Sequence, residues 1–535
     1  MARPQLPPLE SVVGDLFADR TRVRTLVAGA AALLAAGIDP RIWAPQLTTV
    51  QAAVRAQPGL DSLIMLNGLA AAIVLLAGGA IGDLSRARPL IRGGLVVLVG
   101  TALVGLLLPD TAMFAAARIV SNLAGAIVFP VALASIALAF NGIARATAIG
   151  IGYAAFGIGQ AVMPILLEVV PGSYAPGFIA ALVAALIALR LAWGTGFELP
   201  QPRPAERPYI VGTALWASGI VALATGVLWL GSGLTNPIRL GIIAAGLLLL
   251  GAYVVLERRR RVLQPERIRV ERRPVTVALF AGLVIAVAQN IPMSQLPNYF
   301  GVILGYGPLF GIVAVAPLFV ALVLAGPVAG YLLARVSPRT LVGGGIVAVG
   351  IGNLAMGLIL GRDASYIGFV LPLVLIGGGF VIATTVRTAI IFASVPRGLP
   401  ATAAAMNEAS IQVGARAGIL ISAAVIGQVG LATLDAALAQ AGVSADAAAA
   451  QHDQFAGLLA VFGTPAFASL IGAVHPDDIA GYGDAYLAGL RAAFLLGGAA
   501  AVVGGAIAWA VLGRRDPLTS VYEHRDERQH ADGVA

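Results

Sequence analysis

The sequence predicts an all-α integral membrane protein with fourteen transmembrane helices. The chain has 535 residues, of which 59% are hydrophobic and only 11% are charged, and its mean hydropathy is +0.91. A soluble domain carries about 25% charged residues, so this composition excludes a soluble enzyme, a disordered tail protein and a secreted disulfide scaffold. One membrane-spanning helix needs about 20 mostly apolar residues. The chain is therefore long enough for a polytopic bundle with modest loops.

Apolar segments of that length recur along the whole chain. We predict helices over residues 24–46, 60–82, 89–108, 112–140, 146–170, 174–196, 209–231, 237–256, 274–297, 306–334, 339–361, 364–394, 401–429 and 485–512. The residues before the first segment are polar and contain Arg, and that segment leads straight into further membrane segments. The start of the chain is therefore not read as a cleavable signal peptide.

The placement of Arg supports this helix count. All 34 basic residues are Arg, and basic residues gather in the cytoplasmic loops of membrane proteins. With the N-terminus inside, the predicted outer loops and their borders contain only Arg55, Arg239 and Arg362. We therefore expect a multi-pass protein of the bacterial inner (plasma) membrane with both termini in the cytoplasm. The net charge of +8 follows from this topology and does not indicate nucleic-acid binding.

One long connection is ambiguous. Residues 430–484 contain no Arg and six Asp, and within them Phe455–Val474 is apolar but interrupted by Pro465. A fifteenth span here would place the Arg-bearing tail outside. We therefore expect a surface-lying or re-entrant helix at the outer face.

A short pattern occurs twice, once in Gly79–Arg88 and again in Gly330–Arg339. Each copy stands at the cytoplasmic end of a Gly-containing helix, which suggests two six-helix bundles, as in transporters built from repeated halves. The predicted organisation is a cytoplasmic N-terminus (1–23), a first six-helix bundle (24–196), a linker with two inserted transmembrane helices (197–273), a second six-helix bundle (274–512) with the outer loop 430–484, and a cytoplasmic tail (513–535).

The first copy offers a gate between helices. Gly79 and Gly82 allow close helix approach, and Asp83 can cap a helix N-terminus or pair with Arg. Arg86 and Arg88 can hold a neighbouring helix end in one state of a rocking cycle. An ordinary positive cytoplasmic loop is the alternative. The second copy contributes the gating candidates Gly330, Arg335 and Arg339.

The first copy resembles the signature loop of the major facilitator superfamily, Gly-x-Leu-Ala-Asp-Arg-x-Gly-Arg-Arg/Lys. Fourteen helices with an inserted pair resemble the drug:proton antiporter branch of that family. The sequence departs from the pattern at Leu84, Arg86 and Ala87, and Ala334 replaces the Asp in the second copy. The resemblance implies the major-facilitator fold, alternating access around a midplane site, and a proton gradient rather than a cofactor as the energy source.

Helix 1 contains the first candidate for proton coupling. The run from Ile38 to Trp43 includes Asp39 and Arg41 and resembles the Leu-Asp-x-Thr motif of the same branch, with Arg41 in place of Thr. An Asp buried in a bundle can carry a proton near neutral pH. A structural ion pair of Asp39 with Arg41 or Arg118 is the alternative. We place Arg41 and Trp43 in the substrate cavity.

Helices 4 and 5 add polar candidates. Arg118 and Asn122 are four residues apart and share a helix face, and their run resembles the family's Arg-x-x-Gln-Gly. Because a guanidinium does not deprotonate in proteins, Arg118 would tune a nearby carboxylate such as Asp39, and Asn122 would line the cavity. Helix 5 contributes Gln160 within a row of small residues. That row weakly resembles the Gly-Pro-containing antiporter motif, but Ile158 stands where Pro is expected.

The second half offers further polar residues inside predicted spans. They are Gln289, Asn290, Arg387, Glu408, Gln412 and Arg416. The last three follow an i, i+4, i+8 spacing and form one helix stripe. A lipid-facing charge costs roughly 3 kcal/mol at the bilayer centre, so the charged residues must pair or line a wet cavity. We read Glu408 as a second proton-coupling residue and the other five as cavity residues.

Together these residues predict a proton-coupled exporter of amphipathic small molecules or drugs. The candidate cavity holds four Arg against two carboxylates, which favours an anionic or zwitterionic substrate, so an exporter of a lipid or anionic metabolite is the alternative. A non-transporting receptor or scaffold on the same fold ranks lower.

No enzymatic chemistry is expected. The chain has no Cys, its four His lie outside the predicted spans, and a phosphate-binding loop of the Gly-x-x-x-x-Gly-Lys type cannot exist without Lys. We expect no catalytic or metal residues, no cofactor and no nucleic-acid partner. The expected partners are protons, a small amphipathic substrate and the lipid bilayer, with the protein acting as a monomer.

Overall fold

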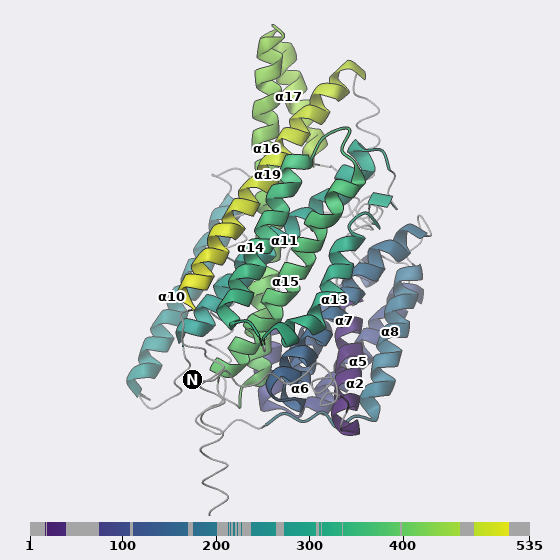
Figure 1. Ribbon diagram of the computed structural model, residues 1–535, viewed down its shortest axis with the longest axis vertical. Coiled ribbons are helices and arrows are strands. Elements are labelled where there is room, and N and C mark those ends of the chain that lie inside the picture. Colours follow the sequence, from purple (N-terminus) through teal and green to yellow (C-terminus); the bar gives the residue numbers. More distant parts are fainter. Residues whose placement is uncertain are drawn as a thin grey trace, which may run out of the picture.

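The computed structural model is a bundle of long helices that run up and down between two ends (Figure 1). It describes residues 19–38, 74–107, 111–169, 175–200, 237–263, 272–306, 310–395 apart from 312 and 334, 398–460 and 476–512, with a few single positions elsewhere. Within this part of the chain the secondary structure is helical and contains no strand. The predicted all-α class is confirmed.

The first half of the bundle follows the predicted order of helices. Its elements are α2 (Arg20–Ile38), the helix Val74–Leu84, α5 (Ala87–Leu107), α6 (Thr111–Ala139), α7 (Gly142–Val169) and α8 (Ala175–Trp193). After it comes α10 (Pro237–Leu263), the second helix of the predicted inserted pair. Most of the first helix of that pair lies outside the described residues.

The second half comprises α11 (Arg272–Asn298), the π-helical turn η4 (Tyr299–Ile303), α13 (Ala316–Leu333), α14 (Pro338–Ile359), α15 (Tyr366–Ser394), α16 (Pro400–Gln440), α17 (Ala445–Ala460) and α19 (Pro476–Val511). Among the described residues, ten helices are long and apolar enough to cross a membrane, and Val74–Leu84 and Leu240–Leu256 are shorter apolar helices. The chain is therefore a multi-pass membrane protein.

The two halves repeat one packing pattern. In the first half α2 packs on α7, and α5 packs on α6 and α8. In the second half α11 packs on α16, and α14 packs on α15 and α19 in the same way. This correspondence makes α2, α5, α6, α7 and α8 the counterparts of α11, α14, α15, α16 and α19. The predicted domain boundaries themselves stay a prediction.

Close contact between the halves depends on glycine. A Cβ added at Gly150 of α7 would lie 2.0 Å from the carbonyl oxygen of Gly326 in α13, and one added at Gly326 would lie 2.6 Å from the carbonyl of Gly150. No side chain fits between the two backbones, which is the packing mode that small residues permit in membrane bundles.

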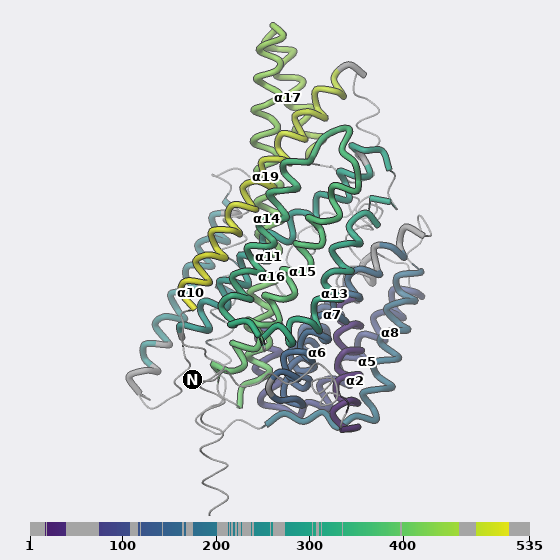
Figure 2. Tube along the Cα trace, viewed as in Figure 1, coloured from purple at the N-terminus to yellow at the C-terminus, as the bar shows by residue number. Residues whose placement is uncertain are grey.

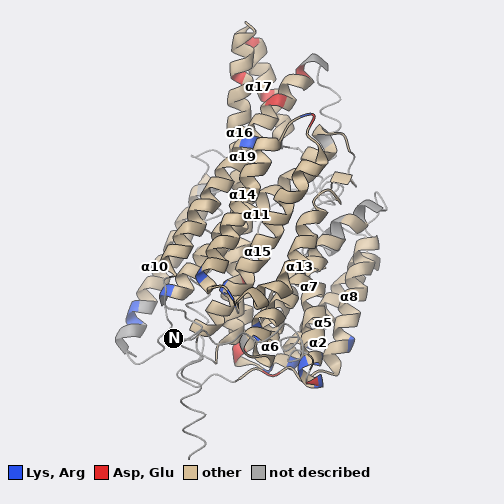
Figure 3. Cartoon of the chain, in the orientation of Figure 1, with Lys and Arg blue, Asp and Glu red and all other residues tan. Residues whose placement is uncertain are grey.

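Charge separates the two ends of the molecule (Figure 3). Arg gathers at the end where α2, α5, α7, α11, α14 and α16 begin, which we call the basic end. The opposite, acidic end carries Asp435, Asp446, Asp453, Asp478 and Asp484. There α17 and the adjoining parts of α16 and α19 project beyond the other helices (Figure 2).

This projection corrects one prediction. Residues 430–440 were expected in a connection, but α16 continues to Gln440, and α19 begins at Pro476 rather than at 485. The extension is rich in Ala, the residue with the highest helix propensity, so it stays helical beyond the apolar span. The predicted surface or re-entrant helix Phe455–Val474 lies largely outside the described residues, apart from 455–460 at the end of α17.

The predicted start of a helix at residue 306 is also wrong. Pro292 and Pro297 interrupt the hydrogen-bond ladder of α11, which passes into the π-helical turn η4. Gly305 then adopts a positive φ of 68°, and α13 begins only at Ala316. A π-helical turn is a local departure that apolar periodicity does not reveal.

Candidate functional site

At the basic end, the carboxylate of Asp83 binds the first turn of α16. One carboxylate oxygen accepts the backbone N–H of Ala401 at 2.7 Å, and the other accepts that of Thr402 at 2.8 Å. The Asp83 side chain is fully buried. The first N–H groups of a helix lack partners within the helix and carry its positive partial charge. Of the two roles considered for Asp83, the structure therefore shows the helix cap, and it joins the two halves.

Gly79 and Gly82 make this approach possible. A Cβ at Gly79 would lie 2.5 Å from the Cβ of Ala405, and one at Gly82 would lie 2.8 Å from the Cβ of Ala401. Both distances are too short for any side chain. The glycines thus bring helix Val74–Leu84 against α16, as the repeat pattern predicts.

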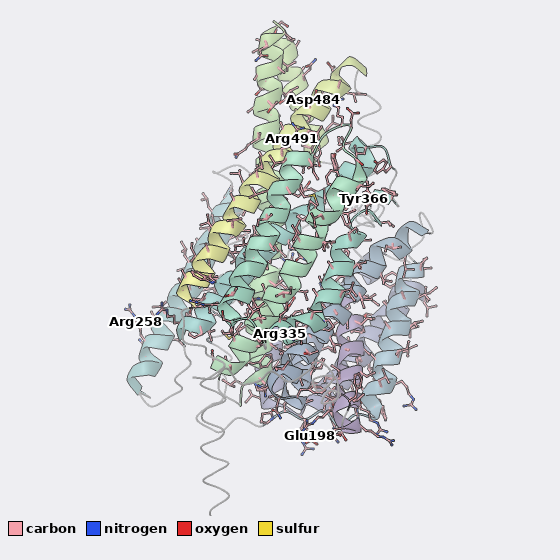
Figure 4. The ribbon with its side chains drawn as sticks, in the orientation of Figure 1. Glu198, Arg258, Arg335, Tyr366, Asp484 and Arg491 are labelled. Carbon is pink, nitrogen blue, oxygen red and sulfur yellow. The ribbon has the colours of Figure 1, made fainter. Side chains whose placement is uncertain are left out.

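Within the described part of the chain, neither Arg of this loop forms a hydrogen bond or an ion pair with α16. Arg86 is exposed, and Arg88 forms an ion pair with Glu198 at 2.9 Å, within the first half. Glu198 marks the basic end in Figure 4. An Arg that sequence reasoning missed contributes more. Arg92 donates to the carbonyls of Ala192 and Trp193 at the end of α8, at 3.2 and 2.8 Å, and lies over the Trp193 ring.

The second copy of the pattern is held differently. A Cβ at Gly330 would lie 2.5 Å from the backbone nitrogen of Thr147, so α13 and α7 touch closely here. Arg335 is exposed and stacks on its neighbour Tyr331 at 4.5 Å. Arg339 lies 4.8 Å from the ring centre of Trp509 in α19. This contact corresponds to that of Arg92 with Trp193 in the first half, because α14 and α19 are the counterparts of α5 and α8.

A buried guanidinium forms the centre of a polar cluster in the second half. The side chain of Arg387, on α15, is fully buried. One terminal nitrogen donates to the Ala278 carbonyl of α11 and to the Ser410 hydroxyl of α16, both at 3.0 Å. The other donates to the Asn407 carbonyl of α16 at 3.2 Å. All three acceptors are neutral, so the charge of Arg387 is held by dipoles.

Gly282 of α11 provides the space for this guanidinium. A Cβ at Gly282 would lie 2.0 Å from the Nη1 of Arg387 and 2.4 Å from the Oγ of Ser410. Sequence reasoning missed Gly282, because nothing local distinguishes it from the other glycines of the spans. Only the neighbour across the helix interface shows why it is small.

Glu408 lies beside this cluster and is incompletely bonded. Its side chain is 2% exposed, one oxygen accepts the amide of Gln412 at 2.8 Å, and the other oxygen has no hydrogen-bond partner among the described protein groups. No ion pair within 4 Å joins it to Arg387, although the two groups attract each other electrostatically. A bare charged oxygen in such a place costs several kcal/mol (roughly 2–7 even for a neutral polar group). The site therefore suits a group that binds a proton.

Tyr153 connects the cluster to the first half. This residue of α7 is buried, and its hydroxyl receives a hydrogen bond from the side-chain amide of Asn407. It also lies 3.5 Å from the hydroxyl of Thr388 on α15. Its ring packs within the first half, 6.2 Å from that of Phe129. Sequence reasoning missed Tyr153, which stands between the glycines of helix 5.

The predicted stripe on α16 leads outward from this cluster. Glu408 is buried and Gln412 is half-buried, whereas the Arg416 side chain has accessible surface although protein surrounds most of it. Because a charge in lipid costs roughly 3 kcal/mol, a partly accessible Arg416 within a span fits a cavity between helices better than the lipid face. The stripe thus runs from a closed region to a wet one.

The other polar candidates are less involved. Gln289 and Asn290 are buried on α11, and the Asn290 amide donates to the Ala286 carbonyl of its own helix at 2.9 Å. Asn122 and Gln160 are half-buried, and each takes part in an interaction. The structure does not bring these four into the Arg387 cluster.

Four candidates cannot be placed. Asp39, Arg41 and Trp43 lie outside the described residues, as does the side chain of Arg118, whose backbone belongs to α6. The pairing of Asp39 with either Arg stays a prediction.

At the acidic end, Arg side chains connect neighbouring elements. Arg362 pairs with Asp484 at 2.8 Å, and Arg491 donates to the Leu360 carbonyl, at 3.0 and 2.6 Å, beyond the end of α14. Asp484 and Arg491 mark this region in Figure 4. An open groove of about 470 Å³ lies between α16 and α17.

Within the described part of the chain, no group of three or more His, Cys, Asp or Glu side chains is placed to hold a metal ion.

Comparison with known proteins identifies the family. The sequence model of the Major Facilitator Superfamily matches residues 28–419. The chain is 25% identical over 405 residues to YebQ, an uncharacterised transporter of Escherichia coli, covering 74% of this chain and 86% of that one. It is 29% identical to the puromycin resistance protein of Streptomyces alboniger (65% and 70% covered) and 28% identical to the cephamycin export protein of Amycolatopsis lactamdurans (71% and 80% covered).

Solved structures show the same fold. The human organic anion transporter MFSD10 aligns with a TM-score of 0.56 at 15% identity, covering 92% of this chain and all of that one. The proton:xylose symporter XylE aligns with a TM-score of 0.54 at 12% identity, covering 92% and 95%. At such identities the likeness concerns the fold alone.

Proposed function

Because this chain belongs to the major facilitator superfamily of membrane transporters, we propose that it exports amphipathic small molecules or drugs in exchange for protons. The observation that carries the proposal is Glu408, a buried carboxyl group with one unpartnered oxygen beside the buried Arg387. A transporter of this kind needs a group that binds and releases a proton within the span. Buried carboxyl groups in a transport pathway serve that purpose.

The charge pattern supports an orientation. Basic residues collect on the cytoplasmic side of membrane proteins, so the basic end would face the cytoplasm and the acidic end the outside. The described contacts between the halves include Asp83 with α16, Gly330 with Thr147 and Tyr153 with Asn407. They lie toward the basic end, so the structure would correspond to a state closed on the cytoplasmic side.

In the proposed cycle Glu408 takes up a proton from outside while the basic end is closed. A neutral carboxyl leaves Arg387 with its three neutral acceptors. After the basic end opens, the proton leaves to the cytoplasm, and the resulting carboxylate attracts the guanidinium. Export would then follow from alternation of the two halves around this site.

The substrate class is supported by two of the relatives. They are named for puromycin resistance and for cephamycin export, and each is under 30% identical to this chain. Both names concern the handling of antibiotics, so an amphipathic drug is the first substrate to test.

Ethidium transport in proteoliposomes tests the proposal. The full-length protein would be reconstituted, a pH gradient imposed, and ethidium movement followed by fluorescence with and without a protonophore. We expect gradient-driven movement that the protonophore abolishes. Glu408→Gln should lower this movement at least 10-fold yet leave ethidium exchange without a gradient, because the neutral amide mimics only the protonated state.

Asp446→Asn is the matched control, since Asp446 is an exposed carboxylate on α17. It should transport normally. Gradient-driven transport at the normal rate in Glu408→Gln would contradict the role of Glu408. Asp39→Asn would be measured beside it, because the sequence makes Asp39 the other proton-coupling candidate.

Export of a lipid or anionic metabolite is the second candidate, and the exposed Arg416 on the stripe from Glu408 favours it. A fluorescent anionic lysolipid would be tested in the same vesicles. Its transport, lost in Arg416→Gln while ethidium does not move, would favour this alternative over the drug exporter.

A further inference from the structure

We propose that Tyr153 is the positioning residue through which the protonation state of Glu408 controls the contact between the two halves of the transporter. The inference rests on the proposed function of Glu408 and names the residue that acts between Glu408 and the moving halves. The role of Tyr153 is to connect two parts of the protein.

The contacts of Tyr153 place it at the boundary of the two halves. Its ring belongs to the first half, where it packs against Phe129. Its hydroxyl belongs to the polar cluster of the second half, bonded to the amide of Asn407 on α16 and 3.5 Å from the hydroxyl of Thr388 on α15. One oxygen atom therefore meets two helices of the opposite half, and those helices also carry Arg387 and Glu408.

Asn407 connects Arg387 and Glu408 to Tyr153. Its side chain donates to the Tyr153 hydroxyl, while its backbone carbonyl accepts from Arg387. Glu408 is the next residue of the same helix and interacts electrostatically with both Arg387 and Tyr153. When Glu408 is charged, it attracts the guanidinium of Arg387. The hydrogen bond from Arg387 to the Asn407 carbonyl is then weakened, and this disturbs the bond from the Asn407 amide to the Tyr153 hydroxyl.

The contact is incompletely satisfied, which suits a switch. The side-chain oxygen of Asn407, the hydroxyl of Thr384 and the second oxygen of Glu408 are buried without hydrogen-bond partners. Buried polar groups normally have partners, and the described protein groups supply none for these three atoms in the closed form. We therefore expect a small free-energy difference between the closed and the open form, so that the loss of one hydroxyl group can shift the populations.

Among the residues that the structure describes, Arg387 on α15 and Tyr153 on α7 are the charged or titratable groups that interact with Glu408. Arg416 lies two turns further along α16 and is exposed. On the neighbouring elements Asp83 binds the start of α16, Arg273 stands at the start of α11, and Arg491 donates to the Leu360 carbonyl.

The absence of Cys from the chain allows a direct test. Spin labels would be attached to cysteines introduced by Gly194→Cys and Thr340→Cys, at exposed positions of the basic end in the first and second halves. A Cβ at Gly194 meets nothing within 4 Å. Distances between the labels would be measured in full-length protein in lipid nanodiscs over a series from acidic to alkaline pH.

Tyr153→Phe keeps the ring and removes only the hydroxyl. We expect the population with a separated basic end to rise roughly 5- to 150-fold, because a buried donor loses its partner, and we expect its dependence on pH to disappear. A merely structural role would shift the population without removing the pH response. Tyr366→Phe is the matched control, because that hydroxyl donates to the Ala314 carbonyl within the second half; it should behave like the parent.

Asn407→Ala provides a second test from the other side of the bond. It should have the same effect as Tyr153→Phe, and the double variant should add little, since both remove one interaction. A parent-like pH response in Tyr153→Phe or in Asn407→Ala would overturn the inference.

Measurements on Glu408→Gln distinguish a failure of the inference about Tyr153 from a failure of the proposed function of Glu408. A distance distribution that still responds to pH in Glu408→Gln would refute the role of Glu408 itself. A flat response in Glu408→Gln combined with a normal one in Tyr153→Phe would refute only the role of Tyr153.

Discussion

Replacing Gly282 by Ala should disable the transporter through one methyl group. The new Cβ would lie 2.0 Å from the Nη1 of Arg387, whereas ordinary contact begins at 3.4 Å. The guanidinium must therefore retreat by about 1.4 Å, the difference between those two distances. Such a shift breaks the 3.0 Å bonds from Nη1 to the Ala278 carbonyl and the Ser410 hydroxyl.

The expected cost follows from those two bonds. A hydrogen bond to a charged group contributes about 1.5–3 kcal/mol, so losing both would cost about 3–6 kcal/mol. That is a large part of the roughly 5–15 kcal/mol by which a native protein is stable. We expect a clear fall in the melting temperature in detergent and a loss of gradient-driven ethidium transport of at least 10-fold.

The control and the background variant isolate the cause. Gly427→Ala, on α16, adds a methyl group where nothing lies within 4 Å, so it should not lower stability. Arg387→Lys replaces the planar guanidinium by a slimmer ammonium group, and Gly282→Ala should cost less in that background than in the native chain. A Gly282→Ala protein as stable and as active as the parent would refute the account of this site.

Two further substitutions test the junctions at the basic end. Asp83→Asn should lose one of the two hydrogen bonds to α16 and the negative charge at the N-terminus of that helix, which weakens the closed form by about 2–4 kcal/mol. The distance between the spin labels at the basic end would measure this effect. An unchanged distance distribution would exclude a gating role for Asp83. Gly150→Ala would place a methyl group 2.0 Å from the Gly326 carbonyl and should separate the two halves at the basic end without changing the acidic end. Gly251→Ala is the control, because nothing lies within 4 Å of the added methyl group, and it should leave both ends unchanged.

Much of the fold was predictable because the bilayer constrains it strongly. Spanning segments must be apolar for about 20 residues, and Arg marks their cytoplasmic borders. The predicted bounds of the spans that became α5, α6, α7, α8, α11, α14 and α15 are therefore correct to within a few residues. The prediction failed where other forces decide. The Ala-rich end of α16 is helical but not apolar enough to count as a span, and the break before α13 depends on the prolines of α11 and on Gly305.

From the sequence, the site was predictable only as a set of charged residues whose burial in a membrane span is energetically unfavourable. Arg387 and Glu408 were found because a charge inside a span needs a reason. Their partners were not, because Gly282, Asn407 and Tyr153 are ordinary residues until the packing of α7, α11, α15 and α16 is known. Sequence periodicity gives the face of one helix, whereas a buried polar cluster depends on which faces meet.

The two junctions between the halves are related by the internal repeat but are held by different forces. In the first, the carboxylate of Asp83 binds backbone N–H groups of α16. In the second, where the sequence has Ala334 in place of an acid, α13 meets α7 through the close approach of Gly330 to Thr147 and of Gly326 to Gly150.

This difference decides how each junction opens. Water can rehydrate a carboxylate and the N–H groups that it leaves, so much of the cost of breaking the first junction is returned. Dispersion between closely packed backbones has no such replacement and falls off within a fraction of an ångström. The first junction should therefore respond to changes of charge and the second to changes of volume. Tyr153, on the helix of the second junction and bonded to the helix of the first, is placed to make the two open together.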